Sequence, residues 1–193
     1  MSHEYNSDKT FDKIDFTQNA LAKGEYETCR FLNCDLSNSN LDNVKFIDCT
    51  FESCNLSMAT LNKTALQNID FKNCKMLGLH FDTCSEFGLS VRFDNCNLNH
   101  STFYRTKLKK TVFKNSKLQE VDFTECDLSN SVLDNCDLLN ASFDKTILEK
   151  ADLRTSINYS INPETNRIKK ARFSLTGVVG LLDKYDIEID SKS

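Results

Sequence analysis

The sequence is poor in the residues that usually build turns, since its 193 residues include only five glycines and one proline. It also has no tryptophan, and no apolar run approaches the roughly 18 to 20 residues of a membrane span. The first ten residues are polar and lack the apolar core of a signal peptide. These absences predict one domain, soluble in the cytoplasm, whose turns are made by other residue types.

Charge of neither sign is in large excess, because the net charge is -4 at pH 7. This balance argues against a general nucleic-acid binder. The sequence also lacks a glycine-rich phosphate loop, a nucleophile elbow and a His-Glu-x-x-His pair. We therefore expect no direct nucleic-acid binding, no cofactor, no metal and no catalytic activity.

A large apolar residue recurs at every fifth position, and this repeat is the strongest pattern in the sequence. It runs without exception from Phe11 to Phe81, breaks, and resumes two residues out of phase from Phe93 to Leu153. The side chain two residues before each of these apolar centres is usually small. All nine cysteines occupy that position: Cys29, Cys34, Cys49, Cys54, Cys74, Cys84, Cys96, Cys126 and Cys136. Because a free cysteine packs as a small hydrophobe, we interpret them as core residues, with metal or redox chemistry as the alternative.

A period of five fits neither an α-helix nor an extended strand, so the chain must turn a corner in every repeat. Four sides of five residues close a coil of 20, and stacked coils pair in parallel roughly 4.8 Å apart. The sequence thus predicts an all-β solenoid, a right-handed four-sided parallel β-helix of about eight coils over residues 10–173. Residues 1–9 are expected to be a flexible N-terminus. Apolar centres would fill this tube and leave no lumen for a substrate.

The corners of this coil are expected to consist of asparagine, aspartate, serine and threonine, which tolerate turn geometry. Five asparagines share one corner at 20-residue spacing once the phase shift is allowed for, and should form a ladder of side-chain amides. They are Asn33, Asn73, Asn95, Asn115 and Asn135.

One irregular segment, residues 85–90, interrupts the repeat. Glu86 stands where an apolar centre is needed, which predicts a two-residue bulge eased by Gly88. Either Phe87 or Leu89 is exposed there as a partner contact, or Phe87 folds back to replace Glu86 in the core. The sequence leaves both interpretations open.

The remaining candidate contacts are acidic. One side of the predicted coil carries more acidic than basic residues, and a mimic of duplex DNA would need a continuous acidic stripe there. Ordinary solvated surface charge is the alternative interpretation. The candidates on this side are Asp42, Asp82, Asp122 and Asp144.

The repeat ends before residues 174–190, where the spacing of apolar residues changes. Those at 175–185 fit one face of a short helix, and residues 186–190 alternate like a strand. A solenoid needs its last coil covered, so we expect this segment to be a cap. Alternatively, it would join two copies across a two-fold axis. The residues concerned are Leu175, Val178, Val179, Leu182, Tyr185, Ile187 and Ile189.

Three repeats carry a resemblance to a known family: Cys34-Asp35-Leu36-Ser37-Asn38, Cys126-Asp127-Leu128-Ser129-Asn130 and Ala151-Asp152-Leu153-Arg154. They are similar to the A(D/N)LXX pattern of the pentapeptide-repeat family, and the resemblance covers nearly the whole chain.

Within that family, the chain resembles the bacterial quinolone-resistance proteins, although it lacks their long projecting loops. Those proteins are dimers joined at their C-terminal ends that bind DNA gyrase or topoisomerase IV as DNA mimics or as protectors against the drug. The resemblance therefore implies a non-enzymatic homodimer that binds a type II topoisomerase and confers fluoroquinolone resistance. The alternative is a generic interaction scaffold with another protein partner.

Overall fold

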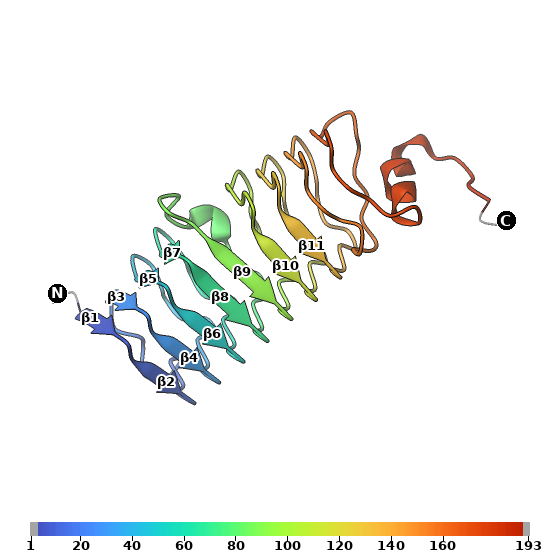
Figure 1. The fold of residues 1–193 in the computed structure, drawn as a ribbon. Helices are drawn as coiled ribbons and strands as arrows, with labels where there is room; N and C mark the ends of the chain where they lie inside the picture. Colours follow the sequence, from blue (N-terminus) through green and yellow to red (C-terminus); the bar gives the residue numbers. More distant parts are fainter. Residues whose placement is uncertain (1–3, 191–193) are drawn as a thin grey trace.

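The five-residue repeat winds into a four-sided parallel solenoid, shown along its length in Figure 1. The computed structural model describes residues 4–190. Two sides are formed by hydrogen-bonded sheets, and the other two are held by isolated parallel bridges that follow the same spacing. This arrangement confirms the predicted all-β solenoid.

The first sheet is the start of what we call the β1 face. Its strands are β1 (Glu4–Ser7), β3 (Gly24–Glu27), β5 (Lys45–Ile47) and β7 (Ala65–Gln67). Beyond β7 the same side continues as bridges that join Lys107, Asp127, Ile147 and Arg167.

The second sheet has seven strands and forms the β2 face. They are β2 (Thr10–Asp12), β4 (Arg30–Leu32), β6 (Thr50–Glu52), β8 (Ile69–Lys72), β9 (Val91–Asp94), β10 (Val112–Lys114) and β11 (Val132–Asp134). These strands mark about seven turns, slightly fewer than the eight coils expected, because pairing beyond β11 is reduced to bridges at Asp152 and Arg172.

The remaining two sides are named after the first bridge of each. The Asp15 face contains the bridges from Asp15 through Asp35 and Asn55. The Asn40 face contains Asn40 paired with Thr60 and, farther along, the bridged series His80, Thr102, Asp122 and Ser142.

Stacked side chains fill the interior. The ring of Phe31 lies 4.6 Å from that of Phe51, and the ring of Phe93 lies 5.0 Å from that of Phe113, each pair nearly parallel. Phe71 pairs in register with Phe93, so the stack continues across the two-residue insertion. Such ring pairs add about 0.5 to 1.5 kcal/mol each beyond the area they bury. The inward apolar centres predicted by the repeat therefore stack on the β2 face as a column of phenylalanine rings.

The corners are made without glycine in nearly every repeat. The residue two after most centres has a positive φ, as at Asn73 with 54° and Asn115 with 50°. Asparagine tolerates this left-handed conformation better than most residues. The side chain of Asn95 donates to Asn73 at 2.7 Å, and Asn135 donates to Asn115 at 2.9 Å. Asn33 and Asn115 instead donate to Asp12 and Asp94, so the predicted amide ladder is confirmed only at these two steps.

The solenoid begins earlier than expected, so the prediction of a flexible segment over residues 1–9 is wrong from Glu4 onward. Strand β1 starts at Glu4 and pairs with β3. Asn6 occupies the first centre, is buried, and accepts a hydrogen bond from Lys9 Nζ at 2.6 Å. This coil does not belong to the apolar repeat of the sequence, because its centre is polar.

The C-terminal segment forms two short 3-10 turns, η2 (Gly177–Leu181) and η3 (Asp183–Tyr185), in place of the expected longer helix. A Cβ at Gly177 would lie 2.1 Å from Tyr159 Oη, and one at Gly180 would lie 2.0 Å from the Tyr159 carbonyl oxygen. The turns therefore press directly on the last coil. Within the described residues, the expected strand over 186–190 is absent, which corrects that prediction.

Candidate interaction surface

The inside of the solenoid offers no room for a substrate. An interior hollow bounded by Leu61, Leu66 and Phe71 measures about 10 Å³, which is at the lower limit of what a single water molecule needs. Any site must therefore be sought on the outer surface.

The cysteines are buried and unpaired, as the core-packing interpretation predicts. The thiol of Cys54 points at the Phe31 carbonyl oxygen at 3.3 Å. Burial raises the pKa of Cys49 and of Cys136 to about 12, so these thiols stay protonated and unreactive at neutral pH. Over residues 4–190, no three His, Cys, Asp or Glu side chains are placed to hold a metal ion.

The bulge at residues 85–90 follows a short 3-10 turn, η1 (Phe81–Thr83). Backbone hydrogen bonds fix both of its ends: Ser85 N donates to Thr64 O, and Ser90 N donates to Leu66 O, each at 2.9 Å. Gly88 has a φ of 70°, which favours glycine at that position. The bulge is therefore a fixed feature of the coil.

Phe87 projects from this bulge and is 82% exposed. Its carbonyl oxygen accepts a hydrogen bond from Gln67 Nε2 at 3.3 Å. Leu89 is half-buried and packs against the core, while Glu86 is exposed and forms an ion pair with Lys107 at 3.3 Å. The alternative in which Phe87 fills the core is wrong, because the two inserted residues let Leu89 reach inward instead.

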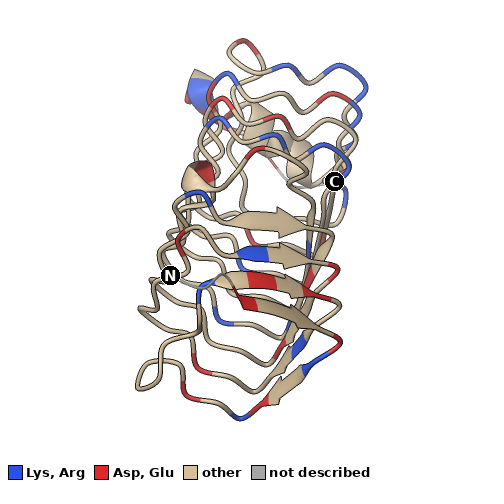
Figure 2. Cartoon of the chain, turned by 90° about the vertical axis from the view of Figure 1, so that its left-hand side faces the viewer, with Lys and Arg blue, Asp and Glu red and all other residues tan. Residues whose placement is uncertain are grey.

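The four candidate aspartates share the Asn40 face, but they do not form a continuous acidic stripe. Asp42 accepts hydrogen bonds from Asn62, and its pKa is lowered by hydrogen bonds from Thr60 and Asn62. Asp82 lies 3.4 Å from His80 Nδ1. Figure 2 shows basic segments between the acidic ones along the rod.

Asp122 and Asp144 lie on the later coils of the same face. Asp122 is half-buried and accepts a hydrogen bond from Thr124 N at 2.8 Å, whereas Asp144 is exposed. On the same coil as Asp122, Glu125 pairs at 2.7 Å with Arg105 of the preceding coil. The negative charge on this face is thus partly neutralised by neighbouring basic side chains.

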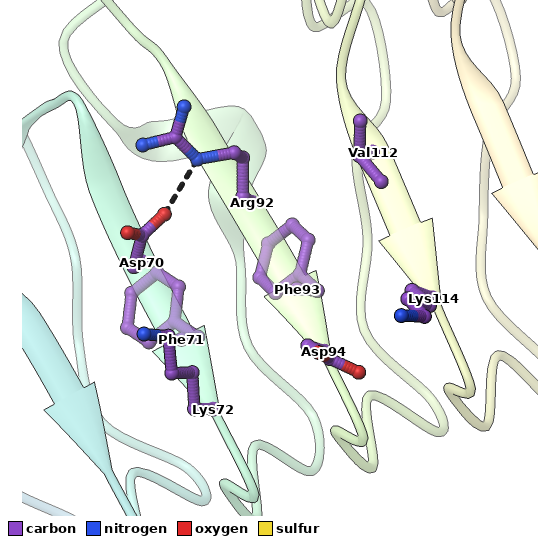
Figure 3. Close-up of a pocket in the computed structure, with 8 residues that line it drawn as sticks. All are labelled: Asp70, Phe71, Lys72, Arg92, Phe93, Asp94, Val112 and Lys114. Carbon is purple, nitrogen blue, oxygen red and sulfur yellow. Dashed lines mark hydrogen bonds and ion pairs between the residues drawn. The ribbon is translucent and has the colours of Figure 1, made fainter.

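A shallow hollow on the β2 face, shown in Figure 3, has no counterpart in any sequence pattern. It measures about 200 Å³ and lies over β8, β9 and β10. The small side chain of Val112 opens it, and Lys72, Asp94 and Lys114 line it with alternating charge. An ion pair between Asp70 and Arg92 lies beside it. Its open shape and mixed charge favour surface contact over chemistry.

The C-terminal segment exposes apolar side chains. Leu175 is 90% exposed, and Leu182 is half-buried, while Leu181 packs against the core. The other expected cap residues are also exposed: Val178, Val179, Tyr185, Ile187 and Ile189. The backbone joins the last coil where Ile161 N donates to Gly180 O at 2.9 Å. From Glu4 to Asp190, no helix has the length and apolar character needed to cross a membrane.

Comparison with protein families agrees with this geometry. The model of a pentapeptide repeat region matches residues 24–86 and 89–160. The chain belongs to the pentapeptide-repeat family. The two matched stretches are separated at Phe87 and Gly88, where the bulge interrupts the coil. No curated protein sequence matches the chain significantly.

Two solved structures resemble the pentapeptide-repeat solenoid described above. One is a trypsin-treated variant of QnrB1, a plasmid-mediated fluoroquinolone resistance protein, with a TM-score of 0.63 and 18% identity over 94% of this chain and 99% of that one. The other is HetL from the cyanobacterium Nostoc sp. strain PCC 7120, involved in heterocyst differentiation regulation, with a TM-score of 0.53 and 12% identity over 89% and 88%. At these identities, the likeness is one of fold.

Proposed function

We propose that this chain is a non-enzymatic protein-interaction module that works by presenting a rigid outer surface. The observation that carries this proposal is the filled interior, where stacked rings leave no cavity for a substrate. Backbone pairing between successive coils holds the outward side chains in a fixed array. Such an array suits recognition of a large partner.

The proposed partner is a type II topoisomerase, either DNA gyrase or topoisomerase IV. The pentapeptide repeat and the resemblance to the quinolone-resistance members support this choice. A topoisomerase has a DNA-binding surface that must be basic, and the Asn40 face offers it the carboxylates of Asp42, Asp82, Asp122 and Asp144 as a partial DNA mimic. Binding there would protect the enzyme from fluoroquinolones.

The bulge supplies the apolar part of the proposed contact. Phe87 is a large exposed ring on a backbone fixed at both ends, which is the kind of residue that anchors interfaces. Glu86 adds a charge beside it, and Leu89 positions the bulge from the core side. We therefore place Phe87 at the centre of the contact.

The proposed module is also a homodimer joined through its C-terminal segment. The exposed side chains of Leu175, Val178 and Val179 would pack against their counterparts across a two-fold axis. Val178→Asp would place a charge in that interface and should make the protein monomeric by sedimentation at high salt, where weak surface ion pairs are screened. A dimer that persists in this variant would rule out the C-terminal interface.

Binding to immobilised gyrase and topoisomerase IV tests the proposed partner. We expect micromolar or tighter binding of the wild type, and at least tenfold weaker binding of Phe87→Ala, because truncating a central anchor removes most of its contact. Met58→Ala is the matched control, since Met58 is 59% exposed on the Asp15 face. Equal loss in both variants, or no binding by the wild type, would contradict the proposal.

A second candidate function is an interaction scaffold with a different partner. The interrupted acidic stripe favours it, because Arg105 pairs with Glu125 where a DNA mimic would need bare negative charge. HetL shows that the same solenoid occurs in a protein with a regulatory role. If topoisomerases do not bind, the wild type should capture a different protein partner, and Phe87→Ala should fail to capture it.

A further inference from the structure

Charge changes sign from one end of the β1 face to the other. Its first coils carry four acidic residues and one basic residue on their outer side: Asp8, Glu25, Glu27, Asp48 and Lys45. Its last coils carry seven basic residues: Lys107, Lys109, Lys110, Lys150, Arg167, Lys169 and Lys170. Asp127 and Glu149 soften the basic end but do not reverse it. A face with opposite charges at its ends is complementary to an inverted copy of itself.

The middle of the β1 face carries one charged residue, Glu86, which forms an ion pair with Lys107. Ile47, Ala65 and Gln67 point outward on β5 and β7 and are half-buried. The next coil is the bulge, where Phe87 projects from the face and is 82% exposed. The face is therefore acidic, then apolar around the bulge, then basic.

The charged ends lie at equal distances from the bulge. The pairing of β1, β3, β5 and β7 places Asp8 four coils before the bulge coil. The bridges from Lys107 to Arg167 place Lys170 four coils after it. With about 4.8 Å between coils, each lies roughly 19 Å from the bulge. Equal spacing is what a two-fold axis at the bulge requires.

The two charges also lie on the same edge of the face. Asp8 and Lys170 both occupy the corner position two after a centre, with φ values of 54° and 61°. Tyr5 and Arg167 both precede a centre and are exposed. Lys150 and Lys170 form no ion pair with any residue from 4 to 190, so their charges are available to a partner.

We propose that two copies of this chain pair face to face and antiparallel through their β1 faces. The two-fold axis lies in the plane of the interface and runs across both rods at the bulge, perpendicular to their length. Each edge of the β1 face in one copy then lies against the same edge in the other copy. Asp8 of one copy then lies opposite Lys170 of the other, and Tyr5 lies opposite Arg167. The two Phe87 rings meet at the axis, where they exclude water from the apolar middle.

This interface is separate from the proposed topoisomerase contact through the Asn40 face and from the C-terminal interface. It does compete for Phe87, so a topoisomerase that uses the bulge would bind the unpaired form. The pairing should be weak and sensitive to salt, because most of its charges lie at the surface.

Sedimentation of two charge-reversed variants tests the proposal. One combines Asp8→Lys with Asp48→Lys, and the other combines Lys150→Glu with Lys170→Glu. All four are corner positions with positive φ, and the chain already has lysine or glutamate at other corners, such as Lys110 and Glu120, so both variants should fold. All proteins in this test also carry Val178→Asp, which removes the proposed C-terminal interface. We expect the Val178→Asp parent to dimerise at low salt, each charge-reversed variant alone to dimerise at least about tenfold more weakly, and an equimolar mixture to restore the dimer.

The loss in each variant alone distinguishes antiparallel from parallel pairing, because a parallel pair would already set Asp8 against Asp8 and Lys170 against Lys170, and reversing one end would leave the number of like-charged pairs unchanged. The mixture shows that the loss comes from charge and not from misfolding, because the Asp8→Lys side chain of one variant then lies opposite the Lys170→Glu side chain of the other. Met58→Lys, on the Asp15 face, is the control and should leave dimerisation unchanged. A Val178→Asp parent that stays monomeric at low salt, a reversed variant that dimerises as this parent does, or a mixture that stays monomeric would each overturn the proposal.

Discussion

A residue's tolerance to substitution follows from its place in the repeat, as the pentad 126–130 illustrates. Cys126 and Leu128 point inward and are fully buried. Asp127 accepts a hydrogen bond from Ser129 N at 3.0 Å, which holds the turn. Asn130 takes the left-handed corner with a φ of 58°. Apolar, turn-forming and left-handed positions therefore alternate along the chain for separate physical reasons.

Leu128→Asp should unfold the protein or lower its free energy of unfolding by about 4 kcal/mol or more, because it buries an unpaired charge in the middle of the rod. Cys54→Ala should cost only about 1 kcal/mol, since it removes one small buried atom. Urea denaturation of both variants measures the difference. A neutral Leu128→Asp would mean that the inward assignment is wrong.

Alkaline pH should destabilise the fold. Burial raises the pKa of Cys49 and Cys136 from 9.0 to about 12, and that of Tyr26 from 10.0 to about 12. A raised pKa means that the native state holds its proton more tightly than the unfolded state, so this stability is present below about pH 9 and is lost as pH rises toward 12. The free energy of unfolding, measured by urea denaturation, should be lower at about pH 10.5 than at pH 7.5 by about 1 to 2 kcal/mol per thiol. Cys49→Ala should show a smaller difference, and a stability that does not change over this pH range would contradict the predicted role of the buried thiols.

At the scale of elements, the corners and the bulge depend on different residues. Ordinary corners accept many side chains in the left-handed conformation, including Lys110 and Glu120. Gly88 is more constrained, because a Cβ there would lie 3.1 Å from the Gln67 side chain as well as requiring a φ of 70°. The bulge therefore combines a replaceable tip with a backbone that needs glycine.

Phe87→Ala and Gly88→Ala form a matched pair that separates the tip of the bulge from its backbone. Phe87→Ala should change the free energy of unfolding by less than about 0.5 kcal/mol, because the ring is exposed. Gly88→Ala should cost about 1 to 2 kcal/mol. Thermal melts of the two variants provide the comparison. A large loss from Phe87→Ala would show that its ring packs on the coil.

The sequence predicted elements whose signal is local and repeated. The repeat was found on both sides of the insertion, because apolar centres recur at every fifth position up to Phe81 and again from Phe93. The first coil was missed since its centre is Asn6, and the 3-10 turns were missed since they depend on contact between Gly177 and the ring of Tyr159. Which residue of the bulge reaches the core also depended on packing, because Phe87 and Leu89 are equally apolar.

At the scale of the whole molecule, charge is sorted by coil. Residues 95–119 include no acidic residue, and residues 120–144 include no basic one. Because stacked residues are 20 apart, opposite charges meet between coils, as where Arg105 pairs with Glu125 and Lys109 lies 3.2 Å from Asp127. Each exposed pair contributes little, yet together they favour the native stacking over a coil that has slipped.

The same rigidity defines how the molecule would act on a partner. Coils joined by continuous backbone pairing cannot close around a ligand, so recognition depends on the fixed spacing of outward side chains. The candidate contacts, the Phe87 bulge and the Asn40 face, both lie on this outer surface.

The most direct measurement is gyrase-catalysed DNA supercoiling against a titration of the purified protein, with and without a fluoroquinolone, and with Phe87→Ala in parallel. The proposed function predicts that low micromolar wild-type protein inhibits supercoiling or restores it in the presence of the drug, and that Phe87→Ala requires at least tenfold more. No effect of the wild type on gyrase or on topoisomerase IV would contradict it.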